Sequence, residues 1–172
     1  MPDGNWSVRR FGSIEEVLAA QKVAPQTGLD LEAAQAWVLP MPDAQQPLFG
    51  AESSDEVAAA EAAGLDLRFY TSGKPLLYLT ESFLTEVVLP PVVFVAKTAY
   101  EVACGAASAY LAKLLERLSE KGQRGTGTVY VWKSDGTVVG YHGPITPASI
   151  SELGALLGAA SSSTTPASNA PQ

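Results

Sequence analysis

Residues 98–142, TAYEVACGAASAYLAKLLERLSEKGQRGTGTVYVWKSDGTVVGYH, decide the fold of this 172-residue chain. Apolar residues recur at helical spacing through the first half of this stretch, while Lys113 and Glu116 fall on its polar side. The spacing predicts a long amphipathic helix over residues 98–121, which Gly122 ends. The apolar positions are Tyr100, Ala103, Ala107, Tyr110, Leu111, Leu114, Leu115 and Leu118.

The second half of the stretch predicts a β-hairpin. Strands over residues 128–133 and 137–142 flank Asp135-Gly136, a pair of residues typical of a type I′ turn. A two-residue loop would place Trp132 opposite Val139 and Tyr130 opposite Tyr141. Both faces of this hairpin are apolar, so we expect one to pack on the long helix and the other on a different element.

Four Ser/Thr-x-x-Glu signatures predict helix starts, because the hydroxyl and the carboxylate can each satisfy a backbone N–H of the first turn. They predict the starts of helices near residues 14–23, 55–63 and 150–157, besides the long helix. The signatures are Ser13–Glu16, Ser53–Glu56, Thr98–Glu101 and Ser149–Glu152.

Further strands are predicted over residues 6–11, 36–41 and 92–96. Residues 65–70 and 75–80 predict a second hairpin, with its turn at 71–74. The whole pattern predicts one α+β domain over residues 1–157, with a mainly antiparallel sheet packed on the long helix. Residues 158–172 contain no charge and no large apolar side chain, so we expect a flexible tail there.

Charge and composition exclude several classes of protein. The net charge is −7, and residues 1–86 alone carry 13 acidic and 5 basic side chains, which disfavours nucleic acid as a partner. The apolar run over residues 83–112 is interrupted by Pro90, Pro91, Lys97 and Glu101, so we expect no membrane contact. With one Cys and one His, we expect no disulfide, no metal site and no cofactor. The first residues lack the features of a signal peptide, which predicts a cytoplasmic protein.

The candidate catalytic residues are His142 and Asp135. Histidine is the side chain that titrates near neutral pH, and a carboxylate could orient it toward a nucleophile. No Gly-x-Ser-x-Gly motif supplies that nucleophile. We therefore expect His142 to be structural and assign no catalytic residue, with a small hydrolase or transferase centred on His142 as the alternative.

The candidate interaction residues are the small side chains of the long helix, where another backbone can approach closely. They predict contact with a protein partner or with a second copy of the chain. They are Ala103, Cys104, Gly105, Ala106 and Ala107.

Residues 100–157 carry a weak resemblance to a known family. The helix segment 109–118, the hairpin segment 129–138 and the helix segment 150–157 follow one another as in the effector-associated constant components of actinobacterial conflict systems. The resemblance implies a small accessory protein, encoded beside proteases, nucleotide-binding proteins or other effectors, with no established catalytic site. We therefore expect a non-catalytic adaptor in a bacterial multi-protein system of the defence or conflict type. A structural assembly protein, of a phage or a particle, is the remaining alternative.

Overall fold

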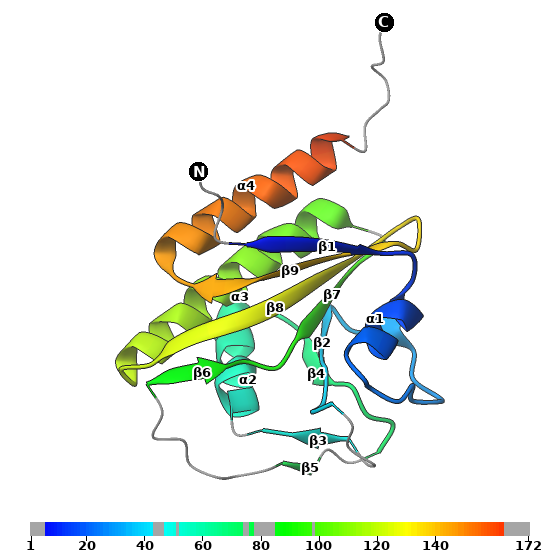
Figure 1. Cartoon of the computed structure of the whole chain (residues 1–172), viewed down its shortest axis with the longest axis horizontal. Coiled ribbons are helices and arrows are strands. Elements are labelled where there is room, and N and C mark those ends of the chain that lie inside the picture. The colour runs from blue at the N-terminus through cyan, green and yellow to red at the C-terminus, as the bar shows by residue number, and fades with distance from the viewer. Residues whose placement is uncertain are drawn as a thin grey trace, which may run out of the picture.

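Parallel and antiparallel strands combine in one sheet that runs through most of the chain. The computed structural model describes residues 6–42, 47–50, 52–73, 76–77, 85–97 and 99–163. The sheet has the strand order β1-β9-β8-β7-β2-β4, and β6 pairs with β8 beside this path (Figure 1). The predicted α+β class is confirmed. The strands are β1 (Ser7–Phe11), β2 (Ala36–Val38), β4 (Leu67–Phe69), β6 (Glu86–Val88), β7 (Val92–Ala96), β8 (Arg124–Lys133) and β9 (Val138–Ile145).

The long helix is confirmed as α3 (Tyr100–Glu120). It connects β7 to β8, which pair in parallel, because neighbouring parallel strands need such a crossover. Helix α2 (Glu52–Ala63) lies in the same way between β2 and β4, which are also parallel. The sheet is therefore mixed. The pairs β1–β9, β8–β9 and β2–β7 are antiparallel. The pairs β7–β8, β2–β4 and β6–β8 are parallel.

The β8–β9 hairpin is confirmed, but its predicted register is wrong by one residue. Trp132 lies opposite Val138, and Thr128 lies opposite His142. The loop holds three residues instead of two, because Lys133 and Thr137 still form a backbone hydrogen bond and Gly136 takes the left-handed conformation (φ 89°). Asp135 accepts hydrogen bonds from Thr137 and closes this loop.

The two described strands of the hairpin predicted over residues 65–80 do not pair with each other, and residues 74–75 and 78–80 lie outside the described residues. Its first strand is β4, which pairs with β2. Its second strand lies at β5 (Leu76–Leu77), which pairs with β3 (Leu48–Phe49) in a separate small sheet. The Gln26 side chain accepts the N–H of Ser72 at 3.2 Å, and its backbone N–H donates to the Tyr70 hydroxyl at 2.9 Å. These long-range contacts direct the chain away from the local turn that its sequence favours.

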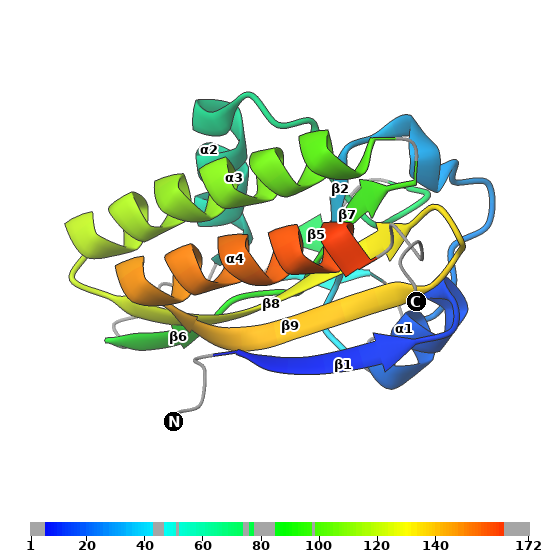
Figure 2. The same ribbon diagram turned by 90° about the horizontal axis from the view of Figure 1, so that it is seen from above.

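Helices cover the sheet unequally on its two faces. Helices α2, α3 and α4 (Pro147–Ser163) cover one face, and α1 (Ile14–Ala20) covers the other (Figure 2). The hairpin contributes to both cores, since Val129, Val131 and Tyr141 face α3 while Tyr130 and Trp132 face the side of α1. A 3₁₀ turn, η1 (Leu31–Ala33), precedes β2.

The helix-start signatures have mixed outcomes. The Ser13 hydroxyl accepts the N–H of Glu16, as predicted, but α1 ends at Ala20 before the expected residue 23. Helix α2 begins at Glu52, so Ser53 lies inside it and forms no cap. Ala99 precedes α3 without a side-chain cap, and Thr98 lies outside the described residues.

The last helix begins earlier and continues further than predicted. Thr146 and Ser149 each donate a backbone N–H to the other's hydroxyl, at 2.9 and 3.1 Å, so the reciprocal cap lies three residues before the predicted one. The helix runs to Ser163, which corrects the predicted tail over residues 158–163. The remainder of that tail, 164–172, lies outside the described residues. No helix in the described part of the chain is long and apolar enough to cross a membrane.

Candidate functional site

The first half of α3 presents a narrow exposed ridge. Val102 is 63% exposed, which is unusual for a large apolar side chain in this protein. Gly105 is also exposed, and a Cβ atom built on it would meet no atom within 4 Å. Helical geometry places these two residues one above the other on the outer side of α3. The ridge, defined here as Val102 and Gly105, therefore lets another backbone approach α3 closely.

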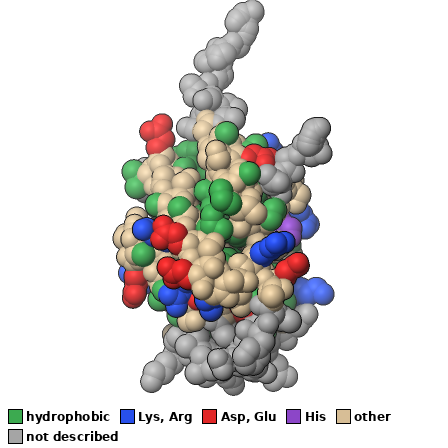
Figure 3. All heavy atoms as spheres, turned by 90° about the vertical axis from the view of Figure 1, so that its left-hand side faces the viewer, with side chains coloured by type: hydrophobic (Ala, Val, Ile, Leu, Met, Phe, Trp, Pro, Cys, Tyr) green, Lys and Arg blue, Asp and Glu red, His purple; other side chains and the backbone are tan. Residues whose placement is uncertain are grey.

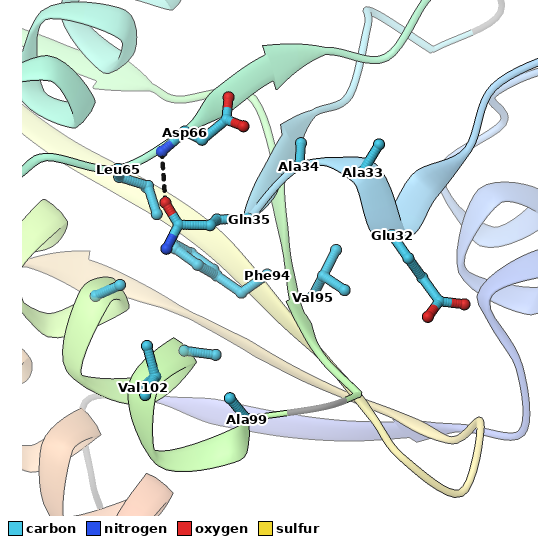
Figure 4. A pocket seen from close by; sticks show the side chains of 12 residues that line it. Glu32, Ala33, Ala34, Gln35, Leu65, Asp66, Phe94, Val95, Ala99 and Val102 are labelled. Atoms are coloured by element: carbon cyan, nitrogen blue, oxygen red, sulfur yellow. Dashed lines mark hydrogen bonds between the residues drawn. The ribbon is translucent and has the colours of Figure 1, made fainter.

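A hollow of about 260 Å³ borders the ridge on the side of β2 and β4. Figure 4 shows Ala99, which precedes α3, and Val102 of α3 on one side of it and Gln35 and Phe94 on the other. Gln35 Oε1 accepts a hydrogen bond from the backbone N–H of Asp66 at 2.7 Å, which fixes the Gln35 side of the hollow. We call this space the β2 hollow.

A groove of about 370 Å³ borders the ridge on its other side, between α3 and α4. The Tyr100 hydroxyl donates to the Leu157 carbonyl at 3.1 Å and fixes the distance between the two helices. Cys104 lies in this groove, where burial raises the pKa of its thiol. A thiol with a raised pKa is a weak nucleophile, so Cys104 contributes shape to this surface. We call this space the α4 groove.

The five predicted interaction residues do not share one face. Ala103 and Ala106 line the β2 hollow, while Cys104 and Gly105 line the α4 groove. Ala107 is fully buried against the sheet, so it cannot contact a partner. The physical reason is that five consecutive residues of a helix turn more than once around its axis. Val102, which sequence reasoning missed, is the exposed large apolar side chain of α3. Its exposure depends on which neighbours the fold places beside it.

His142 lies in the second half of β9, whereas Asp135 lies in the loop before that strand. His142 is four residues beyond the first residue of the strand, about 13 Å along it. Asp135 lies in the loop, where hydrogen bonds from Thr137 lower the pKa of its carboxyl. The partner of His142 is Thr128, whose Oγ1 is 2.8 Å from His142 Nδ1. The structure therefore does not bring the two predicted catalytic candidates together.

Glu56 is a buried acid that sequence reasoning assigned only to a helix cap. Its Oε2 accepts a hydrogen bond from the Tyr110 hydroxyl at 3.1 Å, and both side chains are 1% exposed. Within the described part of the chain, its Oε1 and the nearby Ser53 Oγ have no hydrogen-bond partner. Burial raises the pKa of Glu56 well above its ordinary value, and burial likewise raises the pKa of Tyr110. Glu56 therefore keeps its proton to a higher pH than an exposed glutamate does.

The basic residues of α3 are engaged in ion pairs. Arg117 Nε and Lys121 Nζ lie 2.7 and 2.9 Å from the carboxylate of Asp55, which is 3% exposed on its side chain. Lys113 pairs with Glu116 at 3.8 Å, as the sequence predicts. In Figure 3 acidic and basic side chains alternate over one end of the molecule, without a large area of one sign.

No protein-family model, curated protein or solved structure matches this chain. The described residues contain no group of three or more His, Cys, Asp or Glu side chains that could hold a metal ion. The surfaces described above are therefore the features that bear on function.

Proposed function

We propose that this protein is a non-catalytic interaction component, an adaptor, which binds a helix of a partner protein along the α3 ridge. The observation that carries the proposal is the exposed Val102–Gly105 ridge between the β2 hollow and the α4 groove. Packed helices place the side-chain ridges of one in the grooves of the other, and this surface offers a ridge with a groove on each side.

The size of the β2 hollow supports a protein partner. The β2 hollow, at about 260 Å³, is below the range of roughly 300–1,000 Å³ that small-molecule pockets occupy. A single side chain from a partner helix suits it better than a free ligand. Small residues at Gly105 and Ala106 would let the partner's backbone come close, which gains van der Waals contact along the helix.

The wider setting follows from the resemblance of residues 100–157. We propose that the protein works in the cytoplasm of a bacterium, within a multi-protein system of the defence type. In such a system an adaptor would hold an effector protein in place without acting on it chemically. The separation of His142 from Asp135 supports this proposal over a hydrolase or transferase centred on His142.

Affinity purification with three versions of the full chain tests the proposal. Gly105→Arg places a large charged side chain on the ridge, and the open space around Gly105 lets α3 keep its fold. Ser119→Arg adds the same side chain to the same exposed stripe about 21 Å further along α3. We expect the wild type and Ser119→Arg to recover the same stoichiometric partner from the native host, and Gly105→Arg to lose it.

Two results would contradict the adaptor proposal. One is a partner that Gly105→Arg retains at wild-type yield, since the ridge would then not be the binding surface. The other is a turnover activity of the pure protein that His142→Ala removes while thermal unfolding stays unchanged. Recovery of the chain with copies of itself alone would support the structural-assembly alternative.

A further inference from the structure

A third cavity lies beside the sheet, at the gap between β6 and β7. It has a volume of about 430 Å³, within the range of small-molecule pockets, and it lies where the chain bends between β6 and β7. Pro90 and Pro91 form that bend. Because β6 and β7 pair with successive parts of β8, the bend opens a space beside Thr128, in the middle of β8. We call this space the proline cavity.

The walls of the proline cavity are largely apolar. Leu39, Met41 and Leu89 line it together with four prolines, and Met41 and Val88 are two of the few exposed large apolar side chains of the described residues. Val88 is 75% exposed. Such side chains in a hollow lose contact with water when a ligand covers them, and this favours binding of an apolar group.

Four polar side chains line the same cavity, those of Gln21, Glu52, Thr128 and His142. Thr128 and His142 share a hydrogen bond of 2.8 Å, which fixes the orientation of the imidazole ring. Glu52, in the first turn of α2, adds a carboxylate. Gly50 makes room for it, since a Cβ atom there would lie 2.9 Å from Glu52 Oε1. A pocket with an apolar body and a few fixed polar groups is the usual form of a small-molecule site.

The charge of the lining selects the kind of ligand. Glu52 is the one charged side chain among the described lining residues, which include no Lys and no Arg. Asp55 and Glu56 lie on the following turn of the same helix, and Asp55 is already matched by Arg117 and Lys121. An ammonium group would therefore find an opposite charge here, whereas a carboxylate would be repelled.

We propose that the proline cavity binds a small apolar amine, with its ammonium group at Glu52 and its apolar part against the proline-lined wall. Thr128 and the His142 ring form the polar side of the site. This role is independent of the α3 ridge, because the proline cavity shares no lining residue with the β2 hollow or the α4 groove, so either proposal can fail without the other.

The chain's single histidine makes the proposal directly measurable. The ring protons of His142 give one set of proton NMR signals at low field, which need no further assignment. We would titrate the full-length protein with n-hexylamine, and separately with hexanoate of the same length and opposite charge. The titrations are run at about pH 8, above the range in which histidine ordinarily titrates. We expect saturable shifts of the His142 signals with hexylamine and none with hexanoate.

Matched variants separate binding in the cavity from other effects. Glu52→Gln should weaken hexylamine about tenfold, because it removes the opposite charge and keeps the shape. Val88→Phe should reduce binding by occupying the cavity, whereas Val8→Phe, in β1 and outside the cavity lining, should leave it unchanged. Equal shifts with hexylamine and hexanoate, or no shift with hexylamine in the folded wild type, would overturn the proposal. Wild-type affinity in Glu52→Gln would overturn it as well.

Discussion

At the scale of single residues, Glu56 of α2 is a buried acid whose side chain contacts Tyr110 of α3. A protonated carboxyl can accept from Tyr110 without the full cost of burying a charge. Its ordinary pKa lies near 4.5, and the folded state raises it well above that. Between these two pKa values the folded state binds more protons than the unfolded state, so stability falls as the pH rises.

The pH dependence of stability checks this assignment. We expect the free energy of unfolding to decrease from pH 4.5 upward until Glu56 ionises in the folded state. Glu56→Gln keeps an oxygen that can accept from Tyr110 and cannot ionise, so this part of the decrease should disappear. Urea unfolding of both proteins across this pH range measures it. Parallel curves for wild type and variant would contradict a raised pKa at Glu56.

Cys104 provides a second prediction at this scale. Burial raises the pKa of its thiol, so less thiolate is present near neutral pH than for a free cysteine. We expect iodoacetamide to alkylate the native protein at least about tenfold more slowly than the urea-unfolded protein, because the thiol is also half-buried. Mass spectrometry of timed samples measures both rates. Equal rates would place Cys104 in an open, reactive setting.

At the scale of elements, Asp55 fastens α2 to the C-terminal half of α3. Its carboxylate is buried, while Arg117 and Lys121 are nearly half-exposed, so solvent reduces the strength of the two ion pairs. Asp55→Ala should still lower the free energy of unfolding by about 2 kcal/mol, because charged hydrogen bonds are lost inside the packed interface. Glu116→Ala breaks an exposed pair on the same helix and should cost less than about 0.5 kcal/mol. Denaturant unfolding compares the two variants, and equal losses would contradict a fastening role for Asp55.

Gly140 of β9 lies directly against the Tyr130 side chain of β8. A Cβ atom there would lie 2.8 Å from the Tyr130 ring, which packs edge-on against Phe11. The Tyr130 ring cannot move freely, since the Gln21 side chain also donates to its hydroxyl. We expect Gly140→Ala to destabilise the protein by about 1–3 kcal/mol through overpacking. Thermal unfolding measures the loss, and an unchanged or raised midpoint would show that the ring can shift without cost.

At the scale of the whole molecule, Trp6, the first described residue, links the N-terminal segment to the C-terminal helix α4. Trp6 is 6% exposed, and its indole N–H donates to the Ser149 carbonyl at 2.6 Å, at the start of α4. Strand β1 follows directly and pairs with β9. Contacts between segments this distant in sequence close the largest loops of the chain and carry a large entropic cost.

Truncating Trp6 measures what that closure contributes. Trp6→Ala should lower the free energy of unfolding by about 3–5 kcal/mol, as expected for a large buried aromatic side chain. Trp6→Phe keeps most of the apolar contact and removes the indole donor, so it should cost less. Urea unfolding of the three proteins gives both values. Equal costs for the two variants would assign the effect to the hydrogen bond rather than to packing.

Helices and hairpins that are marked by residues close together in the sequence can be predicted from the sequence alone. The spacing of Tyr110, Leu111, Leu114 and Leu118 gave α3, because a helix buries one side at a fixed period. The Asp-Gly pair gave the β8–β9 hairpin, and the apolar residues on both strands indicated two cores. The Lys113–Glu116 pair was also predictable, since its partners lie three residues apart on one helix.

Features that depend on contacts between residues far apart in the sequence appear only in the tertiary structure. The parallel pairing of β4 with β2 needed the α2 crossover, and no local signal opposes the turn that residues 71–74 favour. The one-residue shift that sets Thr128 opposite His142 depends on the conformation of Gly136. Glu56 meets Tyr110, and Val102 stays exposed, because of where whole helices pack. Periodicity reports which side of an element is buried, whereas the partner on that side is chosen by the assembled fold.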